Sequence, residues 1–180
     1  RDLSNELLQK EAHIFPVLEA LQYEPYSPIG ASNTISWLGP KGFQGETYYL
    51  GENPPFGAAF TYYLKEKYPT VKGEREKSEA ERRKAGETVY YPAYSQMKRE
   101  SEEEAPFLIF TIKDVNGAVV NEIRQSPSEG INRIHWDLKY PSIDEVSTSL
   151  ADPTKNPSSG IMVLPGTYTV ELAKSIDGEV

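Results

Sequence analysis

The chain has 180 residues, which is enough for one domain with a substantial core, or for a domain with an appended segment. Its 27 acidic and 19 basic residues give a formal net charge of -8, which disfavours nucleic acid and anionic membranes as partners because both favour basic surfaces. The absence of cysteine excludes disulfides and thiolate metal sites.

Residues 1–56 are expected to form a connector followed by an aromatic-rich extension. Ser4 or Asn5 is a suitable cap for a short helix over residues 6–12, and Pro16 prevents a longer one. Residues 23–57 are rich in Pro, Gly, Tyr and Ser, so we expect an extended, ordered loop region rather than regular secondary structure. Since the chain begins with Arg1 and ends soon after the turn-forming pair Asp177-Gly178, we expect a piece of a longer protein.

Alternating apolar residues predict that the regular fold occupies residues 57–180 and begins with a strand over residues 57–64. A charged helical insertion is then expected at about residues 65–104. Residues 72–84 and 95–104 are its two helices. The first lacks an apolar stripe and should lie in solvent, supported by Glu79 and Arg83 at helical spacing. The aromatic segment Tyr90-Tyr91-Pro92, with Tyr94, is expected to anchor the insertion on the body of the domain.

Further strands are predicted over residues 107–112, 118–124, 131–139, 160–163 and 167–173. Asn116-Gly117 is a hairpin turn, and Pro165-Gly166 precedes the last strand. About six or seven strands with one charged excursion indicate an all-β fold, an immunoglobulin/fibronectin-III-like β-sandwich. The expected core residues are Phe60, Tyr62, Ile134, Trp136, Leu138, Tyr168, Val170 and Leu172.

Three motifs carry a resemblance to a known family. The pattern Gly-x-Asn-x-Ile-x-Trp-Asp at 130–137, with Leu-Pro-Gly-Thr-Tyr-Thr-Val at 164–170, resembles an Ig-like domain of the flagellar-hook-capping type. The segment Gly-Glu-Asn-Pro-Pro-Phe-Gly-Ala at 51–58 is similar to a segment of large exported bacterial proteins that carry a sortilin-like, BNR-repeat β-propeller and are often labelled glycosyl-hydrolase-like. The resemblance implies an upstream β-propeller of the same polypeptide as partner. It also implies a periplasmic or extracellular location, with any signal peptide upstream of residue 1.

Residues suited to catalysis or metal binding are sparse. His13 and His135 lack metal-ligand spacing, and Gly39-Pro40-Lys41-Gly42 lacks the spacing of a nucleotide-binding loop, so no metal and no cofactor are expected. Asp137 is expected to accept hydrogen bonds from a neighbouring turn. Glycoside hydrolysis needs a pair of carboxylates in a cleft, and the loop residues best placed for it are Glu46, Glu52 and Asp144. No catalytic residue is assigned.

Aromatic residues in loops suggest an alternative to catalysis, namely the binding of carbohydrate. Sugar rings stack on flat side chains, although loop aromatics more often form a small core of their own. The candidates for ligand stacking are Trp37, Tyr48, Tyr49, Tyr90, Tyr91 and Tyr94.

The sequence thus predicts a non-catalytic accessory domain that packs on and orients a β-propeller. The alternative is a carbohydrate-binding module, or an accessory part of a glycoside hydrolase whose active site lies in the propeller. An unpaired strand near the C-terminus is also expected either to allow self-association between copies of the chain or to pair with a strand from the chain's own N-terminal extension.

Overall fold

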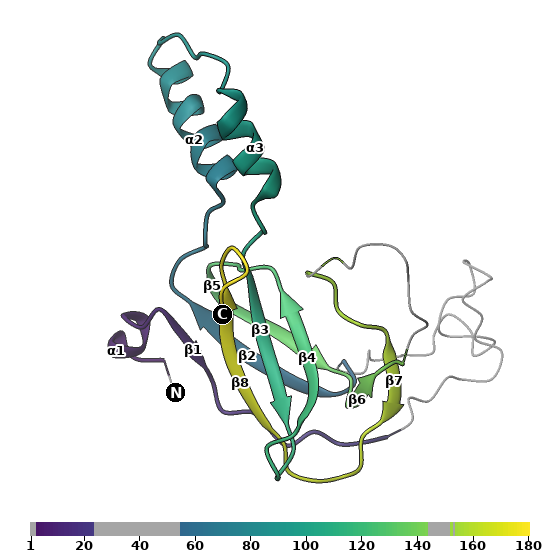
Figure 1. The fold of residues 1–180 in the computed structure, drawn as a ribbon. Coiled ribbons are helices and arrows are strands. Elements are labelled where there is room, and N and C mark those ends of the chain that lie inside the picture. Colours follow the sequence, from purple (N-terminus) through teal and green to yellow (C-terminus); the bar gives the residue numbers. More distant parts are fainter. Residues whose placement is uncertain (1–2, 24–54, 144–151, 153) are drawn as a thin grey trace, which may run out of the picture.

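The computed structural model describes residues 3–23, 55–143, 152 and 154–180 (Figure 1). Within these residues the chain is an all-β protein with antiparallel sheets and few helices. The helices are α1 (Asn5–Leu8), α2 (Val71–Lys84) and α3 (Tyr94–Glu102). The strands are β1 (Ala12–Ile14), β2 (Ala58–Leu64), β3 (Phe107–Lys113), β4 (Val119–Gln125), β5 (Gly130–Trp136), β6 (Lys139–Pro141), β7 (Ser159–Met162) and β8 (Thr169–Ser175).

The strands form two three-stranded sheets and a small third one. The first sheet has the order β1-β2-β5, the second has the order β4-β3-β8, and β6 pairs with β7. Every pairing is antiparallel. In Figure 1, β3, β4 and β8 lie in front of β2 and β5, so the two larger sheets form two layers.

Strand β2 shows how alternate residues of a strand enter the core. Its residues are alternately buried and half-buried along the whole strand, as expected for a strand with one face in the core. Its register with β5 places Phe60 opposite Ile134 and Ala58 opposite Trp136. Gly57, just before the strand, has a φ of 107°, and a Cβ there would lie 1.9 Å from the Trp136 carbonyl oxygen. Only glycine allows this approach of the two chains.

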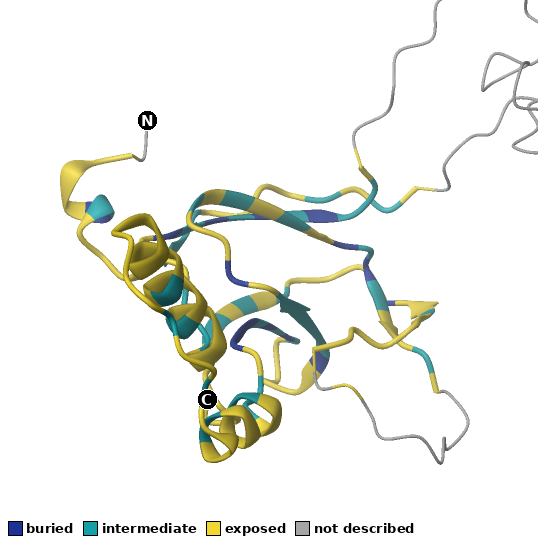
Figure 2. Ribbon diagram, turned by 90° about the horizontal axis from the view of Figure 1, so that it is seen from above, coloured by how far each residue is buried: buried dark blue, intermediate teal, exposed yellow. Residues whose placement is uncertain are grey.

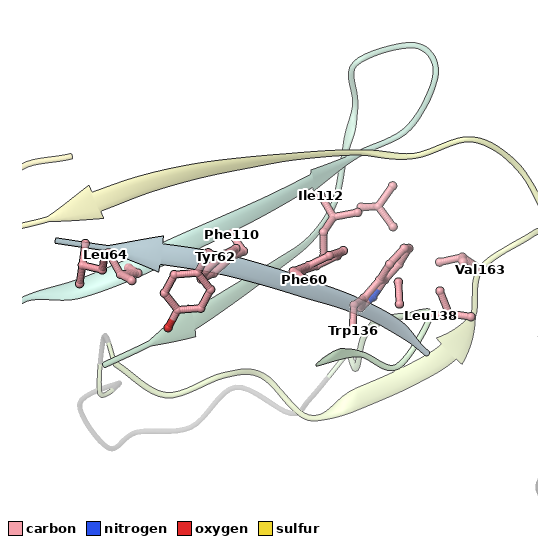
Figure 3. Close-up of a cluster of buried hydrophobic side chains, with 11 residues drawn as sticks. Phe60, Tyr62, Leu64, Phe110, Ile112, Trp136, Leu138 and Val163 are labelled. Atoms are coloured by element: carbon pink, nitrogen blue, oxygen red, sulfur yellow. The ribbon is translucent and has the colours of Figure 1, made fainter. Parts of the chain in front are cut away.

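The core lies between the two larger sheets (Figure 3). The ring of Phe60 in β2 stacks near that of Phe110 in β3, with centroids 6.4 Å apart, and Tyr62 contacts Phe110 with centroids 5.0 Å apart. Aromatic pairs of this kind add to the free energy gained from burying apolar area. Contacts between residues of the two layers therefore hold the sheets face to face.

The residues expected in the core differ in their depth. Phe60, Tyr62, Trp136 and Leu138 are buried, whereas Ile134, Tyr168, Val170 and Leu172 are partly buried and pack against the cluster.

The predicted strand over residues 131–139 is wrong at its end. Strand β5 ends at Trp136, and Leu138 has a φ of 58°, outside the strand region. Leu138 reaches the core from a turn, whose geometry is fixed by the hydrogen bond that the Lys139 N–H donates to the Asp137 carboxylate over 3.2 Å.

The N-terminal segment contributes a strand that the sequence analysis did not predict. Helix α1 is capped by Ser4, whose hydroxyl accepts from the Leu7 N–H, but it ends at Leu8. Strand β1 then pairs with β2, with Ala12 opposite Leu64 and Ile14 opposite Tyr62. The body of the domain thus includes residues before the predicted boundary at 57.

The insertion is a helical hairpin of α2 and α3 that projects from the sheets (Figure 1), and its helices are coloured as exposed or intermediate in Figure 2. Neither helix contains a buried residue. The expected aromatic anchor is wrong, because Tyr90, Tyr91 and Tyr94 are each 82% exposed. The reason is visible in Figure 1: the connection between α2 and α3 lies at the end of the hairpin farthest from the sheets. No helix in the described part of the chain combines the length and apolar character of a membrane span.

Candidate functional site

A groove opens at one end of the two-layered body, and we call it the apolar groove. It has a volume of about 710 Å³. Its lining consists of residues 17–22, residues 163–170 and the side chains of Ala58, Phe60, Ile112, Trp136 and Leu138. Phe60, Ile112 and Trp136 belong to the buried core, so the groove reaches the core itself.

Two aromatic residues shape the floor of the apolar groove. The rings of Trp136 and Tyr168 meet edge to face, with centroids 5.3 Å apart. The Trp136 indole N–H donates to the Lys139 carbonyl over 3.0 Å. The Tyr168 hydroxyl donates to the Leu164 carbonyl over 2.6 Å, and burial raises the pKa of this hydroxyl. Both polar groups have hydrogen-bond partners within the domain, so the floor offers the apolar surfaces of the two aromatic rings to a partner.

The rim of the groove is apolar and accessible. Leu18, Leu21 and Leu164 are 86%, 72% and 77% exposed. Residues 17–22 are held across the opening by the Gln22 side chain, whose amide donates to the Val163 carbonyl over 2.8 Å. Exposed leucines around a groove are unusual for a surface in permanent contact with water, and such patches mark sites of interaction.

The helical hairpin contains a second group of interacting side chains. The Arg75 guanidinium in α2 donates to both carboxylate oxygens of Glu100 in α3, over 2.7 and 2.9 Å, and to Glu79 over 2.6 Å. Hydrogen bonds from Arg75 hold the pKa of Glu100 below its usual value. Glu103 accepts from the Val71 N–H at the start of α2. Since the helices contain no buried apolar residue, these polar contacts join them.

A cavity of about 610 Å³ lies beside these ion pairs, and we call it the hairpin cavity. Its lining includes Arg75, Glu79 and Glu100, together with residues 89–92 of the connecting loop. Tyr90 and Tyr91 therefore border it, whereas the equally exposed Tyr94 is not part of its lining.

The other polar residues considered from the sequence have local partners. The Asp137 carboxylate accepts from the Lys139 N–H and from the Ser159 hydroxyl, which is 2.5 Å away. His13 packs edge to face on Phe15, with centroids 5.1 Å apart, and His135 is exposed on β5. In the described ranges no group of His, Asp and Glu side chains could hold a metal ion.

Several candidates lie outside the described residues. These are the aromatic residues Trp37, Tyr48 and Tyr49 and the carboxylates Glu46, Glu52 and Asp144. Of the six residues considered for ligand stacking, the structure places Tyr90, Tyr91 and Tyr94 on the hairpin.

The amino-acid sequence alone does not predict the apolar groove. Its only signal is the run Val17, Leu18 and Leu21 after Pro16, which has helical spacing although the structure forms no helix or strand over residues 15–23. Such an apolar run predicts that these side chains pack against another surface, but it does not identify that surface. Comparisons of this chain with models of protein families, with curated proteins and with solved structures find no match.

Proposed function

We propose that this chain is a non-catalytic accessory domain that packs on a larger domain of the same polypeptide through the apolar groove. The resemblance described above makes that larger domain a β-propeller, in a protein exported to the periplasm or beyond the cell. The observation that carries the proposal is the exposed rim formed by Leu18, Leu21 and Leu164 above a floor of core residues. Covering these leucines would remove apolar surface from water, the main favourable term in most protein association.

The body of this domain is, in our proposal, an immunoglobulin/fibronectin-III-like sandwich. Two features support this assignment. The orders β1-β2-β5 and β4-β3-β8 correspond to strands A-B-E in one sheet and C′-C-F in the other. In addition, Tyr168 lies just before β8 and its hydroxyl bonds to the backbone four residues upstream, at Leu164. A tyrosine in this place, bonded in this way, is the tyrosine corner of such sandwiches.

A non-catalytic role gives a simple expectation for activity. The isolated 180-residue chain should not hydrolyse aryl-glycosides or oligosaccharides. Turnover that disappears when Glu46, Glu52 or Asp144 is replaced would contradict the proposal.

The docking role is tested in the natural polypeptide that contains this domain. The combined substitution Leu18→Ser, Leu21→Ser and Leu164→Ser should separate the domain from its neighbour. We expect a faster tryptic cleavage between the two and a separate thermal transition for each, while the isolated chain keeps its own melting temperature because these side chains are already exposed in it.

A matched control replaces exposed apolar residues elsewhere. Val115→Ser with Ile143→Ser removes two exposed side chains that do not line the groove. This variant should behave as the wild type in both measurements. If the leucine variant also behaves as the wild type, or if the control separates the domains equally well, docking through the apolar groove is wrong.

A further inference from the structure

The hairpin cavity lies apart from the apolar groove and has no part in the docking proposed above. Its floor is polar and well ordered by its own contacts. The side chains of Arg75 and Glu79 are only 18% and 17% exposed, and that of Glu100 is 7% exposed. Arg75 is held by both carboxylates, so its planar guanidinium has a fixed orientation.

Every charge that lines the cavity has a partner of opposite sign. Arg75 pairs with Glu100 and Glu79, and Arg83 reaches the second oxygen of Glu79 over 3.5 Å. Lys72 lies 3.9 Å from Glu76. A strongly charged ligand that reached Arg75, Glu79 and Glu100 would have to break these largely buried pairs and would leave one member uncompensated. The lining therefore suits an uncharged ligand that exchanges hydrogen bonds with carboxylates and guanidinium groups.

The wall of the cavity provides a different chemistry. Tyr90 and Tyr91 border it and are each 82% exposed, while Met97 adds apolar surface from α3. Tyrosine presents a flat apolar ring with a polar tip, which suits a ligand with both apolar and polar faces. Neither tyrosine has a role in the core, since the hairpin projects away from the sheets (Figure 1).

We propose that the hairpin cavity binds a neutral saccharide. A pyranose ring has an apolar face of C–H groups, which packs on an aromatic ring, and a rim of hydroxyls, which both donate and accept hydrogen bonds. In the cavity the ring packs on Tyr90 or Tyr91. Its hydroxyls donate to the remaining lone pairs of Glu79 and Glu100 and accept from Arg75 and Arg83.

The test uses the full 180-residue chain and four neutral hexasaccharides, made of β-1,4-linked glucose, xylose, mannose or N-acetylglucosamine. Isothermal titration calorimetry should detect binding of at least one of them, with a Kd on the order of 1 mM or lower. Tyr90→Ala and Tyr91→Ala should each weaken that binding about tenfold, the upper end of what one aromatic contact contributes.

Tyr94→Ala is the matched control. Tyr94 is as exposed as the other two tyrosines but does not line the cavity, so its replacement should leave the Kd unchanged. Far-UV circular dichroism should show the same helical signal in all three variants, because none of the side chains is buried. Hexagalacturonate, a chain of acidic sugars, should bind more weakly than the best neutral ligand.

Three results would overturn the proposal. The first is that none of the neutral hexasaccharides binds. The second is that Tyr94→Ala weakens binding as much as Tyr90→Ala and Tyr91→Ala, which would mean that ligand contact lies outside the cavity. The third is tighter binding of hexagalacturonate, which would mean that the ligand class is acidic.

Discussion

Trp136 connects the core of this domain to the apolar groove. It is only 2% exposed, yet its ring forms part of the floor of the apolar groove. Gly57 is required beside its carbonyl oxygen, and Tyr168 packs against its ring. A change at this position therefore affects the first sheet, the turn after β5 and the groove together.

Replacing Trp136 with alanine should cost on the order of 3–5 kcal/mol of unfolding free energy, because the large ring leaves a cavity that its neighbours fill only in part. Chemical denaturation monitored by circular dichroism measures this cost. His135→Ala, at the exposed neighbouring position, is the control and should change the free energy by about 0.5 kcal/mol or less. Equal midpoints for Trp136→Ala and the wild type would show that the indole does not support the core.

At the residue scale, the alternating pattern was sufficient to place Phe60, Tyr62 and Trp136 in the core. It also placed Leu138 there, although for the wrong reason. Leu138 lies beyond the end of β5 in a backbone conformation that only a local turn produces. Periodicity describes regular strands, so it cannot register a buried residue that reaches the core from a turn.

At the scale of elements, the helical hairpin should fold and unfold independently of the sheets. Neither α2 nor α3 buries a residue against the body. Replacing residues 71–103 with a short Gly-Ser loop should therefore leave the melting temperature of the sheets nearly unchanged, since a change in loop length alone alters the closure entropy only slightly. Differential scanning calorimetry provides the comparison. Loss of the cooperative transition would show that the hairpin stabilises the body.

Acid should unfold the hairpin through Glu100. Its pKa is lower in the folded hairpin than the usual 4.5, chiefly because of the hydrogen bonds from Arg75, so the folded state favours the charged form. The stabilisation is fully present above pH 4.5 and is lost as the pH falls through the lower, folded pKa. The helical signal in circular dichroism should therefore decrease below pH 4.5.

Glu100→Gln provides the comparison for this titration. The variant lacks the titrating group and the full charge, so its helical signal should be lower at neutral pH and should change less with acid. A wild-type signal that stays constant throughout the acid titration would contradict the role given to the Arg75–Glu100 pair.

The elements differ in how well the sequence predicts them. Strand β2 alternates along its whole length, β3 begins with the apolar run Phe107–Phe110, and the charged helices have recognisable composition. Strands β1 and β6 contain three residues each, which is too short for a period of two to be recognised. Pairing with β2 and β7, respectively, defines them, and pairing is not visible in a single sequence.

At the scale of the whole molecule, the two edges of the second sheet, β4 and β8, differ in how they are protected. The outer edge of β4 is blocked by Asn156, whose side chain bonds to both the N–H and the carbonyl of Arg124. In the described part of the chain no strand pairs with the outer edge of β8. Beyond the end of β8, Glu179 forms an isolated antiparallel bridge with Ile176 across the Asp177-Gly178 turn.

The edge of β8 should therefore mediate self-association at high concentration. Along an antiparallel strand, the N–H and C=O groups of successive residues point alternately to one edge and to the other. The backbone groups of Ile176 bond to Glu179, away from β3, so those of Val170 and Leu172 also point away from β3. Light scattering should detect larger species as concentration rises, and hydrogen exchange should slow at Val170 and Leu172 but not at Arg124. A chain that remains monomeric, with exchange at Val170 and Leu172 independent of concentration, would show that this edge is not available.

The apolar groove also depends on the fold of the whole molecule, and for this reason the sequence could not predict it. The groove is lined by residues 17–22, by Trp136 and Leu138, and by residues 163–170, which are distant in the chain and meet only when both sheets and the connector are in place. The hairpin tyrosines were identified as candidates because they are local in sequence. Their exposure, however, depends on the direction in which the hairpin leaves the body.

The central claim is that the apolar groove docks on another domain of the same polypeptide. Hydrogen–deuterium exchange, followed in the natural polypeptide and in the isolated 180-residue chain, tests it most directly. The account predicts slower exchange at residues 17–22 and 163–168 in the natural polypeptide, with unchanged exchange at residues 115–119, which lie outside the groove. Equal exchange at residues 17–22 and 163–168 in the two samples would contradict it.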